Sequence, residues 1–157
     1  LVDNFGNLLS RVTNMISERC ENKTVKLRTG EVFDQFFKES DIFLEKFVNL
    51  MNEYKFHTAA NEIFKFSSMI NQLIDQNKPW LLFKEDKLNE MNDVLYLSLH
   101  GIKIILFALK SFIPHKVDEI IKMLQFENLN IINVKNKNEI YCIKEKINCF
   151  IKLTKES

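Results

Sequence analysis

Glycine and proline are scarce in this sequence, which contains three and two of them in 157 residues. Long stretches contain neither, whereas folds built from many β-hairpins need both residues at their turns. The scarcity therefore excludes a multi-turn β fold and predicts an all-α protein. At 18.6 kDa the chain is long enough for one packed core.

Cysteine is also scarce, and its pattern is not that of a disulfide framework or a zinc site. Cys20, Cys142 and Cys149 are odd in number, widely separated, and form no C-x-x-C pair. Free thiols in a reducing compartment are the expectation, without zinc. No signal peptide is recognisable either. We therefore expect a cytoplasmic protein, which leaves an organellar location open.

Motifs for covalent chemistry are missing from the sequence. It has no glycine-rich phosphate loop, no H-E-x-x-H and no nucleophile elbow. His57, His100 and His115 lie in separate segments, without a carboxylate or cysteine at ligand spacing, so we expect surface or helix-cap roles for them. We predict no catalytic residue and no metal site. Because the net charge is only +1, any nucleic acid must be bound by a local patch.

Apolar residues recur instead at helical spacing, which predicts about five helices. They should cover residues 1–21, 31–54, 57–77, 88–112 and 114–126. Residues 94–113 are long enough to span a bilayer, but polar residues such as Ser98, His100 and Lys103 gather on one side. This favours a core helix with a narrow polar stripe facing solvent, and no membrane partner. Short connections make the five helices an antiparallel bundle.

The chain divides into a helical bundle, residues 1–126, and a tail, residues 127–157. In the tail, the apolar pieces IINV and IYCI flank the polar run KNKNE, which predicts a short hairpin. We expect the tail to pack back on the bundle or on a catalytic domain outside this sequence. Between the third and fourth helices, the segment KPWLLFKED is predicted to be a connection, in which Pro79 restricts Lys78 to extended geometry.

Arginine usage draws attention to the first predicted helix. Of 22 basic residues only Arg11, Arg19 and Arg28 are arginine. Asn7 and Arg11 lie four residues apart, one turn above the other, on the side opposite the apolar arc. An arginine in a chain that otherwise uses lysine can mark a need for a planar fork of donors. A solvated surface arginine remains an equally simple interpretation at this point.

Trp80, the only tryptophan, lies outside the phenylalanine-rich helices, directly after Pro79. Lys78, Lys84 and Lys87 surround it in the sequence. A rigid aromatic among cations suits stacking on an unpaired base while the ammonium groups meet phosphates. A hydrophobic plug under a loop is the alternative, and the residues alone do not exclude it.

The combination of motifs is more specific than either one. NLLSR on the first helix, followed about 70 residues later by D-x-x-x-P-W-x-x-x-K, here Asp75, Pro79, Trp80 and Lys84, resembles the anticodon-binding domain of methionyl-tRNA synthetases. The likeness covers residues 1–126. Synthetases for leucine, isoleucine, valine and cysteine share the bundle, but the pairing of N-L-x-S-R with P-W points to the methionine enzyme.

The resemblance implies that Asn7, Arg11 and Trp80 read the anticodon CAU of methionine tRNA, with Pro79 shaping the corner. Its implied partners are the anticodon loop and the catalytic domain of the same enzyme, with no role for DNA. The parent enzyme would join methionine to tRNA using ATP and magnesium. The H-x-G-H and K-M-S-K signatures are absent here, so this chain should bind tRNA without aminoacylating it and without a cofactor. The alternatives are a helical protein-interaction domain and the equivalent bundle of another class I synthetase.

Overall fold

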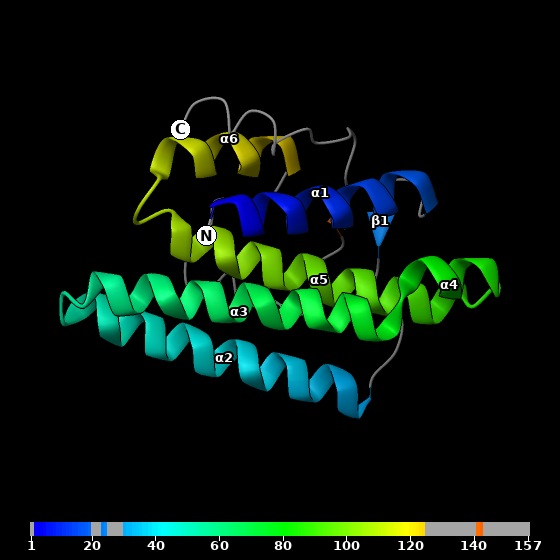
Figure 1. The fold of residues 1–157 in the computed structure, drawn as a ribbon, viewed down its shortest axis with the longest axis horizontal. Coiled ribbons are helices and arrows are strands. Elements are labelled where there is room, and N and C mark those ends of the chain that lie inside the picture. The colour runs from blue at the N-terminus through cyan, green and yellow to red at the C-terminus, as the bar shows by residue number, and fades with distance from the viewer. Residues whose placement is uncertain (1, 20–22, 25–29, 125–140, 143–157) are drawn as a thin grey trace.

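The computed structural model describes residues 2–19, 23–24, 30–124 and 141–142 (Figure 1). This part of the chain is almost entirely helical, as predicted. Its helices are α1 (Val2–Arg19), α2 (Glu31–Asn52), α3 (Phe56–Asn77), α4 (Pro79–Lys84), α5 (Leu88–Leu109) and α6 (Pro114–Leu124). The five predicted helices are all present, and α4 is an additional short helix. The all-α prediction is therefore confirmed.

Successive long helices alternate in direction and form an antiparallel bundle (Figure 1). Helix α5 lies at its centre, in contact with each of the other five. Seventeen of its 22 residues are buried. A helix that is apolar nearly all round must be enclosed by protein or lipid, and here the other helices enclose it. Helix α5 is long and apolar enough to cross a membrane, but 89% of its most apolar window lies inside the fold.

The middle of the polar stripe predicted on this central helix does not face solvent, although Lys110 and Ser111 at its end are exposed. Ser98, His100 and Lys103 are all at most 1% exposed. The hydroxyl of Ser98 donates to the carbonyl of Val94, and the His100 ring lies edge-on to Phe37 with the centroids 5.0 Å apart. The surface role predicted for His100 was therefore wrong. Helical periodicity identifies a polar face but does not report which neighbours cover it.

The corner between α3 and α4 also differs from the prediction. Lys78 adopts a left-handed conformation, with φ 46° and ψ 65°, and is not extended. Its backbone N–H bonds to the carbonyl of Ile74 and closes α3, while its own carbonyl accepts from the N–H groups of Leu81 and Leu82 and begins α4. Pro79 is then the first residue of α4, where its missing N–H costs nothing. What was predicted as a connection is a tight helix-to-helix corner.

A pair of two-residue strands lies beside the bundle. Strand β1 (Lys23–Thr24) runs antiparallel to β2 (Tyr141–Cys142), with Lys23 opposite Cys142 and Thr24 opposite Tyr141. The described part of IYCI thus pairs with the connection after α1. The IINV half of the predicted hairpin, and most of residues 127–157, lie outside the described residues.

Candidate nucleic-acid interface

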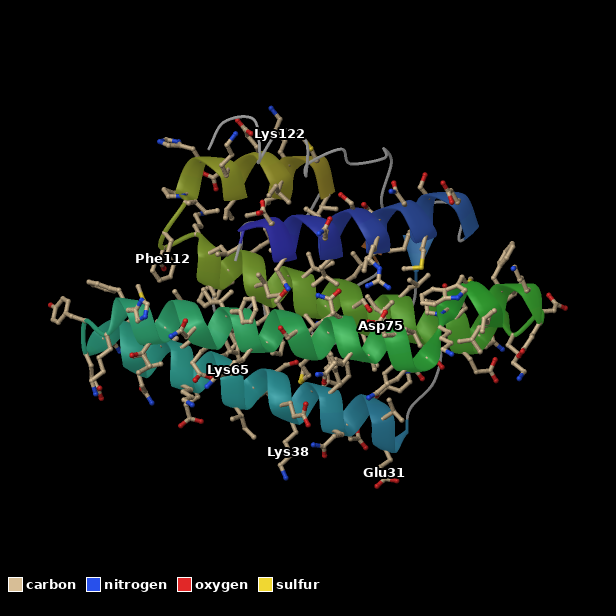
Figure 2. All side chains as sticks on the ribbon, in the orientation of Figure 1. Glu31, Lys38, Lys65, Asp75, Phe112 and Lys122 are labelled. Atoms are coloured by element: carbon tan, nitrogen blue, oxygen red, sulfur yellow. The ribbon has the colours of Figure 1, made fainter. Side chains whose placement is uncertain are left out.

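The side chain of Arg11 crosses from α1 to α3. Its Nη2 donates to Oδ1 of Asp75 at 2.9 Å, and its Nη1 donates to Oδ1 of Asn71 at 3.3 Å. Asp75 lies near the end of α3 that leads into α4 (Figure 2). The side chain of Arg11 is 38% exposed and that of Asp75 is 62% exposed, so the pair lies at the surface. The first motif, NLLSR, is therefore joined directly to the Asp75 that begins the second.

Two further hydrogen bonds stabilise this contact between α1 and α3, which we call the α1–α3 seam. The Oγ of Ser67 donates to Oδ1 of Asn4 at 2.7 Å, one turn of α3 before Asn71. The Nδ2 of Asn71 donates to the backbone carbonyl of Ser67 at 3.4 Å. Ser67, Asn71 and Asp75 follow one another at one-turn intervals on α3. They contact Asn4 and Arg11, which lie two turns apart on α1. The seam holds both helices in register beneath the Arg11 fork.

Asn7 is exposed on α1, one turn before Arg11. The apolar side of the same helix, which includes Leu8 and Val12, is completely buried. The predicted orientation of Asn7 away from the core is therefore confirmed. An exposed amide next to a guanidinium fork offers a base one acceptor and several donors.

Pro79 and Trp80 occupy the first two positions of α4, at the end of the molecule toward which α1 runs (Figure 1). Pro79 is buried, whereas Trp80 is half-buried and packs against the hydrophobic core. Part of the indole is thus anchored while the rest remains accessible. This arrangement combines features of both interpretations of Trp80, the plug and the stacking platform.

The lysines near Trp80 are exposed, but not all of them are unpaired. The Nζ of Lys87 lies 2.9 Å from Oε2 of Glu85, and this hydrogen bond raises the pKa of Lys87, as does the charge of Glu85. Lys78 and Lys84 are exposed on either side of Trp80 in the sequence. Both can contact phosphates, because an exposed ammonium group on a flexible side chain can follow the sugar–phosphate backbone of a nucleic acid.

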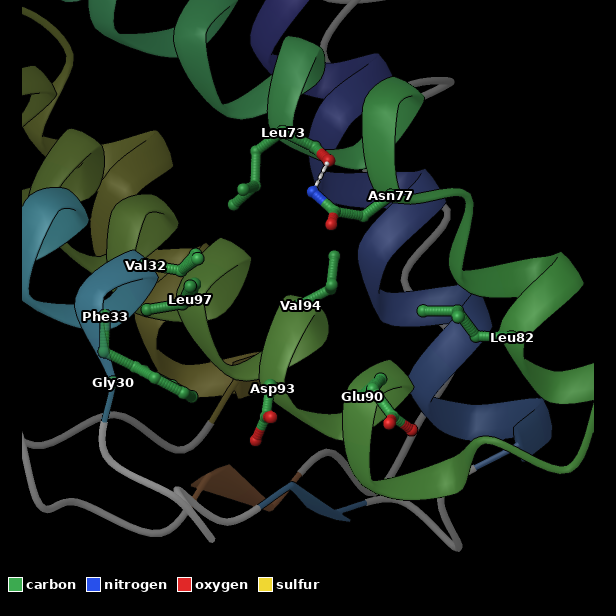
Figure 3. A pocket seen from close by; sticks show the side chains of 10 residues that line it. All are labelled: Gly30, Val32, Phe33, Leu73, Asn77, Leu82, Glu90, Asp93, Val94 and Leu97. Atoms are coloured by element: carbon green, nitrogen blue, oxygen red, sulfur yellow. Dashed lines mark hydrogen bonds between the residues drawn. The ribbon is translucent and has the colours of Figure 1, made fainter.

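A cavity of about 350 Å³ opens between the start of α2, the end of α3, α4 and the start of α5 (Figure 3). Its apolar lining comprises Val32, Phe33, Leu73, Leu82, Val94 and Leu97. Glu90 and Asp93 add carboxylates, and the amide of Asn77 donates back to the carbonyl of Leu73 at 2.8 Å. Apolar walls with acidic groups disfavour a polyanion. None of the four predicted site residues lines this cavity.

Of the four predicted site residues, the structure links Arg11 to α3 by hydrogen bonds and relates the other three to it by position. Arg11 is bound to α3, and Asn7 lies one turn before it on α1. Pro79 and Trp80 lie four and five residues beyond Asp75. Asn71 was not predicted as a site residue, and Asp75 was predicted only as a motif position. Their spacing of four residues on one helix, with the second in the motif, was the available signal. In the described part of the chain, no cluster of three metal-ligating side chains occurs.

Comparison with known proteins agrees with the motifs. The family model described as "Anticodon-binding domain of tRNA ligase" matches residues 35–154. A methionine–tRNA ligase of Thermotoga maritima is 29% identical over 132 residues, which cover 81% of this chain and 20% of that protein. The corresponding ligase of Mycoplasmopsis pulmonis is 31% identical over 129 residues, covering 82% and 25%. The chain thus spans about a fifth to a quarter of these relatives.

Solved structures show the same fold. The free-state methionyl-tRNA synthetase of Mycobacterium tuberculosis superposes with a TM-score of 0.86, covering 96% of this chain and 32% of that chain at 16% identity. The methionyl-adenylate complex of that synthetase gives 0.85. At such low identity the likeness concerns the fold alone.

Proposed function

This chain belongs to the family of anticodon-binding domains of tRNA ligases, and we propose that it binds the anticodon loop of methionine tRNA and reads CAU. The observation that carries the proposal is the Arg11 fork, held at the surface between α1 and α3 by Asp75 and Asn71. The sequence relatives named methionine–tRNA ligase support the choice of tRNA.

The first anticodon base is the one that Asn7 and Arg11 are suited to read. Cytosine presents two acceptors and an amino donor on its pairing edge. An amide that donates and accepts, beside a guanidinium, satisfies that pattern. Uracil carries a donor at its ring nitrogen, which would face another donor and leave a group unpaired. Within the described residues, Arg11 uses two of its five N–H donors on α3, and three remain for a base.

Trp80 supplies the second half of the site. Its ring packs on the core, so a splayed base can stack on the exposed part without ordering the indole first. Lys78 and Lys84 lie close along the chain and would meet the phosphates of the loop. Hydrogen bonding from α1 and stacking from α4 together select the base and keep it out of the loop stack.

We propose that the catalytic domain of the parent enzyme lies outside this chain. The parent enzyme joins methionine to its tRNA using ATP and magnesium, and a catalytic domain of the same protein is the second partner of this bundle. This domain contributes tRNA selection. Residues Asn7, Arg11, Pro79 and Trp80 form the proposed anticodon site.

The deciding experiment compares two RNAs that differ in one base. The 157-residue chain is titrated with methionine tRNA carrying CAU and with the same tRNA carrying UAU. We expect UAU to bind at least about fivefold more weakly, because a good base-edge contact contributes about 1–3 kcal/mol of discrimination. A tRNA changed outside the anticodon loop is the control and should bind like the CAU tRNA. Equal affinity for CAU and UAU would overturn the proposal.

A further inference from the structure

The two ends of the Arg11 fork are held by side chains of different kinds. Asp75 provides a charge at Nη2, whereas Asn71 provides a neutral acceptor at Nη1. We infer that Asn71 is a positioning residue, which orients the guanidinium plane of Arg11 so that its remaining donors face the first anticodon base. This inference rests on the proposed function and adds a specificity-determining residue to that site.

Asn71 is itself oriented by its own helix. Its Nδ2 donates to the carbonyl of Ser67, and this bond turns Oδ1 toward Arg11. A flipped amide would place its NH₂ group against the guanidinium, donor against donor, and would lose both bonds. Asn71 is half-buried in the α1–α3 seam, where it has less freedom than an exposed side chain.

Asp75 alone would not fix the plane of the guanidinium. The Asp75 carboxylate is 62% exposed, and an exposed ion pair is weak and screened by salt. With one contact at Nη2, the guanidinium can pivot about the bond to Asp75. A second contact at Nη1 defines the plane, because two points on a rigid fork leave it little rotation. Asn71 makes that second contact.

A fixed orientation of the Arg11 guanidinium plane contributes more to the discrimination between bases than to the overall attraction of RNA. The charge of Arg11 attracts RNA in any orientation, but donor-to-acceptor geometry separates cytosine from uracil. A guanidinium held in place before binding also pays less ordering entropy when the base arrives. Removal of the Asn71 acceptor should therefore lower the preference for cytosine while affinity for a generic RNA loop changes little.

The first measurement needs no RNA. With only three arginines in the chain, the Nε–H region of a ¹⁵N spectrum is simple, and Arg11→Lys assigns the Arg11 signal by its loss. In Asn71→Leu and Asn71→Ala, we expect the order parameter of the Arg11 Nε–H bond to fall below about 0.6, the range of flexible groups. Asn71→Asp keeps an acceptor oxygen and should restore order.

Ser67→Ala is the matched control. It removes the hydrogen bond to Asn4 in the same seam but keeps the backbone carbonyl that orients Asn71. Arg11 order should therefore stay at the wild-type value. If Arg11 is equally ordered in the wild-type chain and both apolar variants, the positioning role is wrong. If Ser67→Ala also releases Arg11, the seam as a whole, and not Asn71, orients the fork.

The second measurement is the ratio of affinities for anticodon stem-loops with CAU and UAU. We expect Asn71→Leu to reduce this ratio by about threefold or more, and Arg11→Lys to abolish most of it. Asn71→Asp and Ser67→Ala should keep it within about twofold. If the wild-type chain shows no preference, the proposed function fails, whatever the order of Arg11. If the wild type prefers CAU and Asn71→Leu frees Arg11 without lowering the ratio, the present inference alone is overturned.

Discussion

Trp80 combines two environments within one side chain. The neighbouring Pro79 is buried, and the indole is half-buried against the core. A tryptophan used only as a plug would have its whole ring covered, and one used only for stacking would need no such anchor. Partial burial therefore suits a rigid platform, whose exposed part is available to a base.

Trp80→Ala should weaken binding of the CAU anticodon by about 1–3 kcal/mol, because a stacking platform is lost. Helix content, measured by circular dichroism, should stay close to the wild-type value. Leu81→Ala is the control, since Leu81 is the next residue of α4 and is 39% exposed. Should Trp80→Ala instead melt the bundle, Trp80 is a core residue and the stacking role is not supported.

At the scale of elements, an ion pair between Lys46 and Glu62 joins helices α2 and α3 near the surface. Glu62 on α3 receives hydrogen bonds from Lys46 of α2 at 3.1 Å and from Lys65, one turn along α3, at 3.3 Å. Burial of the carboxylate raises its pKa, but the hydrogen bonds and charges of the two lysines outweigh burial, so the pKa is lowered from 4.5. The folded state therefore favours the ionised form of Glu62.

Glu62→Gln should lower the free energy of unfolding at pH 7 by about 0.5–1 kcal/mol, as for other ion pairs near the surface. Because the folded pKa is the lower one, the contribution is complete above the unfolded pKa and is lost as pH falls through the folded pKa. Denaturant titrations at pH 7 and pH 3 should show the difference between wild type and variant shrinking at pH 3. A difference that stays constant or grows would contradict this assignment.

Element boundaries illustrate how much could be predicted locally. The starts of α2 and α6, predicted at residues 31 and 114, follow from spacing within one segment, so they were predicted correctly. The α3–α4 corner was not, because Lys78 enters the left-handed region, where its N–H donates to a carbonyl of α3 and its own carbonyl accepts from N–H groups of α4. Hydrogen bonds across a corner depend on both of its sides, and neither side alone predicts them.

Over the whole molecule, packing around α5 sets how closely the helices approach. A side chain at Gly101 would overlap the Cδ1 of Ile70 on α3 and lie 3.2 Å from the ring of Phe36 on α2. Gly101 is buried, and Ile70 is fully buried. The glycine therefore serves as a contact point where three helices meet, although glycine is a poor helix former.

Gly101→Ala should destabilise the fold, because overpacking by about 1–3 kcal/mol exceeds the gain in helix propensity of about 1 kcal/mol. Ile70→Val removes the overlapping Cδ1 and should cost about 0.5–1.5 kcal/mol alone. The double variant should be more stable than the sum of the two effects predicts, which denaturant unfolding of all four chains can measure. Strict additivity would show that the two residues do not compete for this space.

The candidate site could be predicted from the sequence only where its residues lie close together in the chain. The orientation of Asn7, the side of Arg11 away from the core, and the Pro79–Trp80 pair each follow from residues close in the chain. The partners of Arg11 do not, because Asn71 and Asp75 lie 60 and 64 residues away. Nothing in a single sequence reports which pairs so distant will meet.

The amino-acid sequence by itself determined that this protein is helical, about where its long helices begin, and which motifs resemble an anticodon-binding domain. Helical periodicity and proline act over a few residues, which is why these features can be read from the chain alone. Only the tertiary structure decided that His100 and Lys103 are buried, that α4 forms a corner, and that Asn71 holds Arg11. Those outcomes depend on which surfaces of distant segments pack together, since burial and hydrogen bonding between helices are properties of the pair.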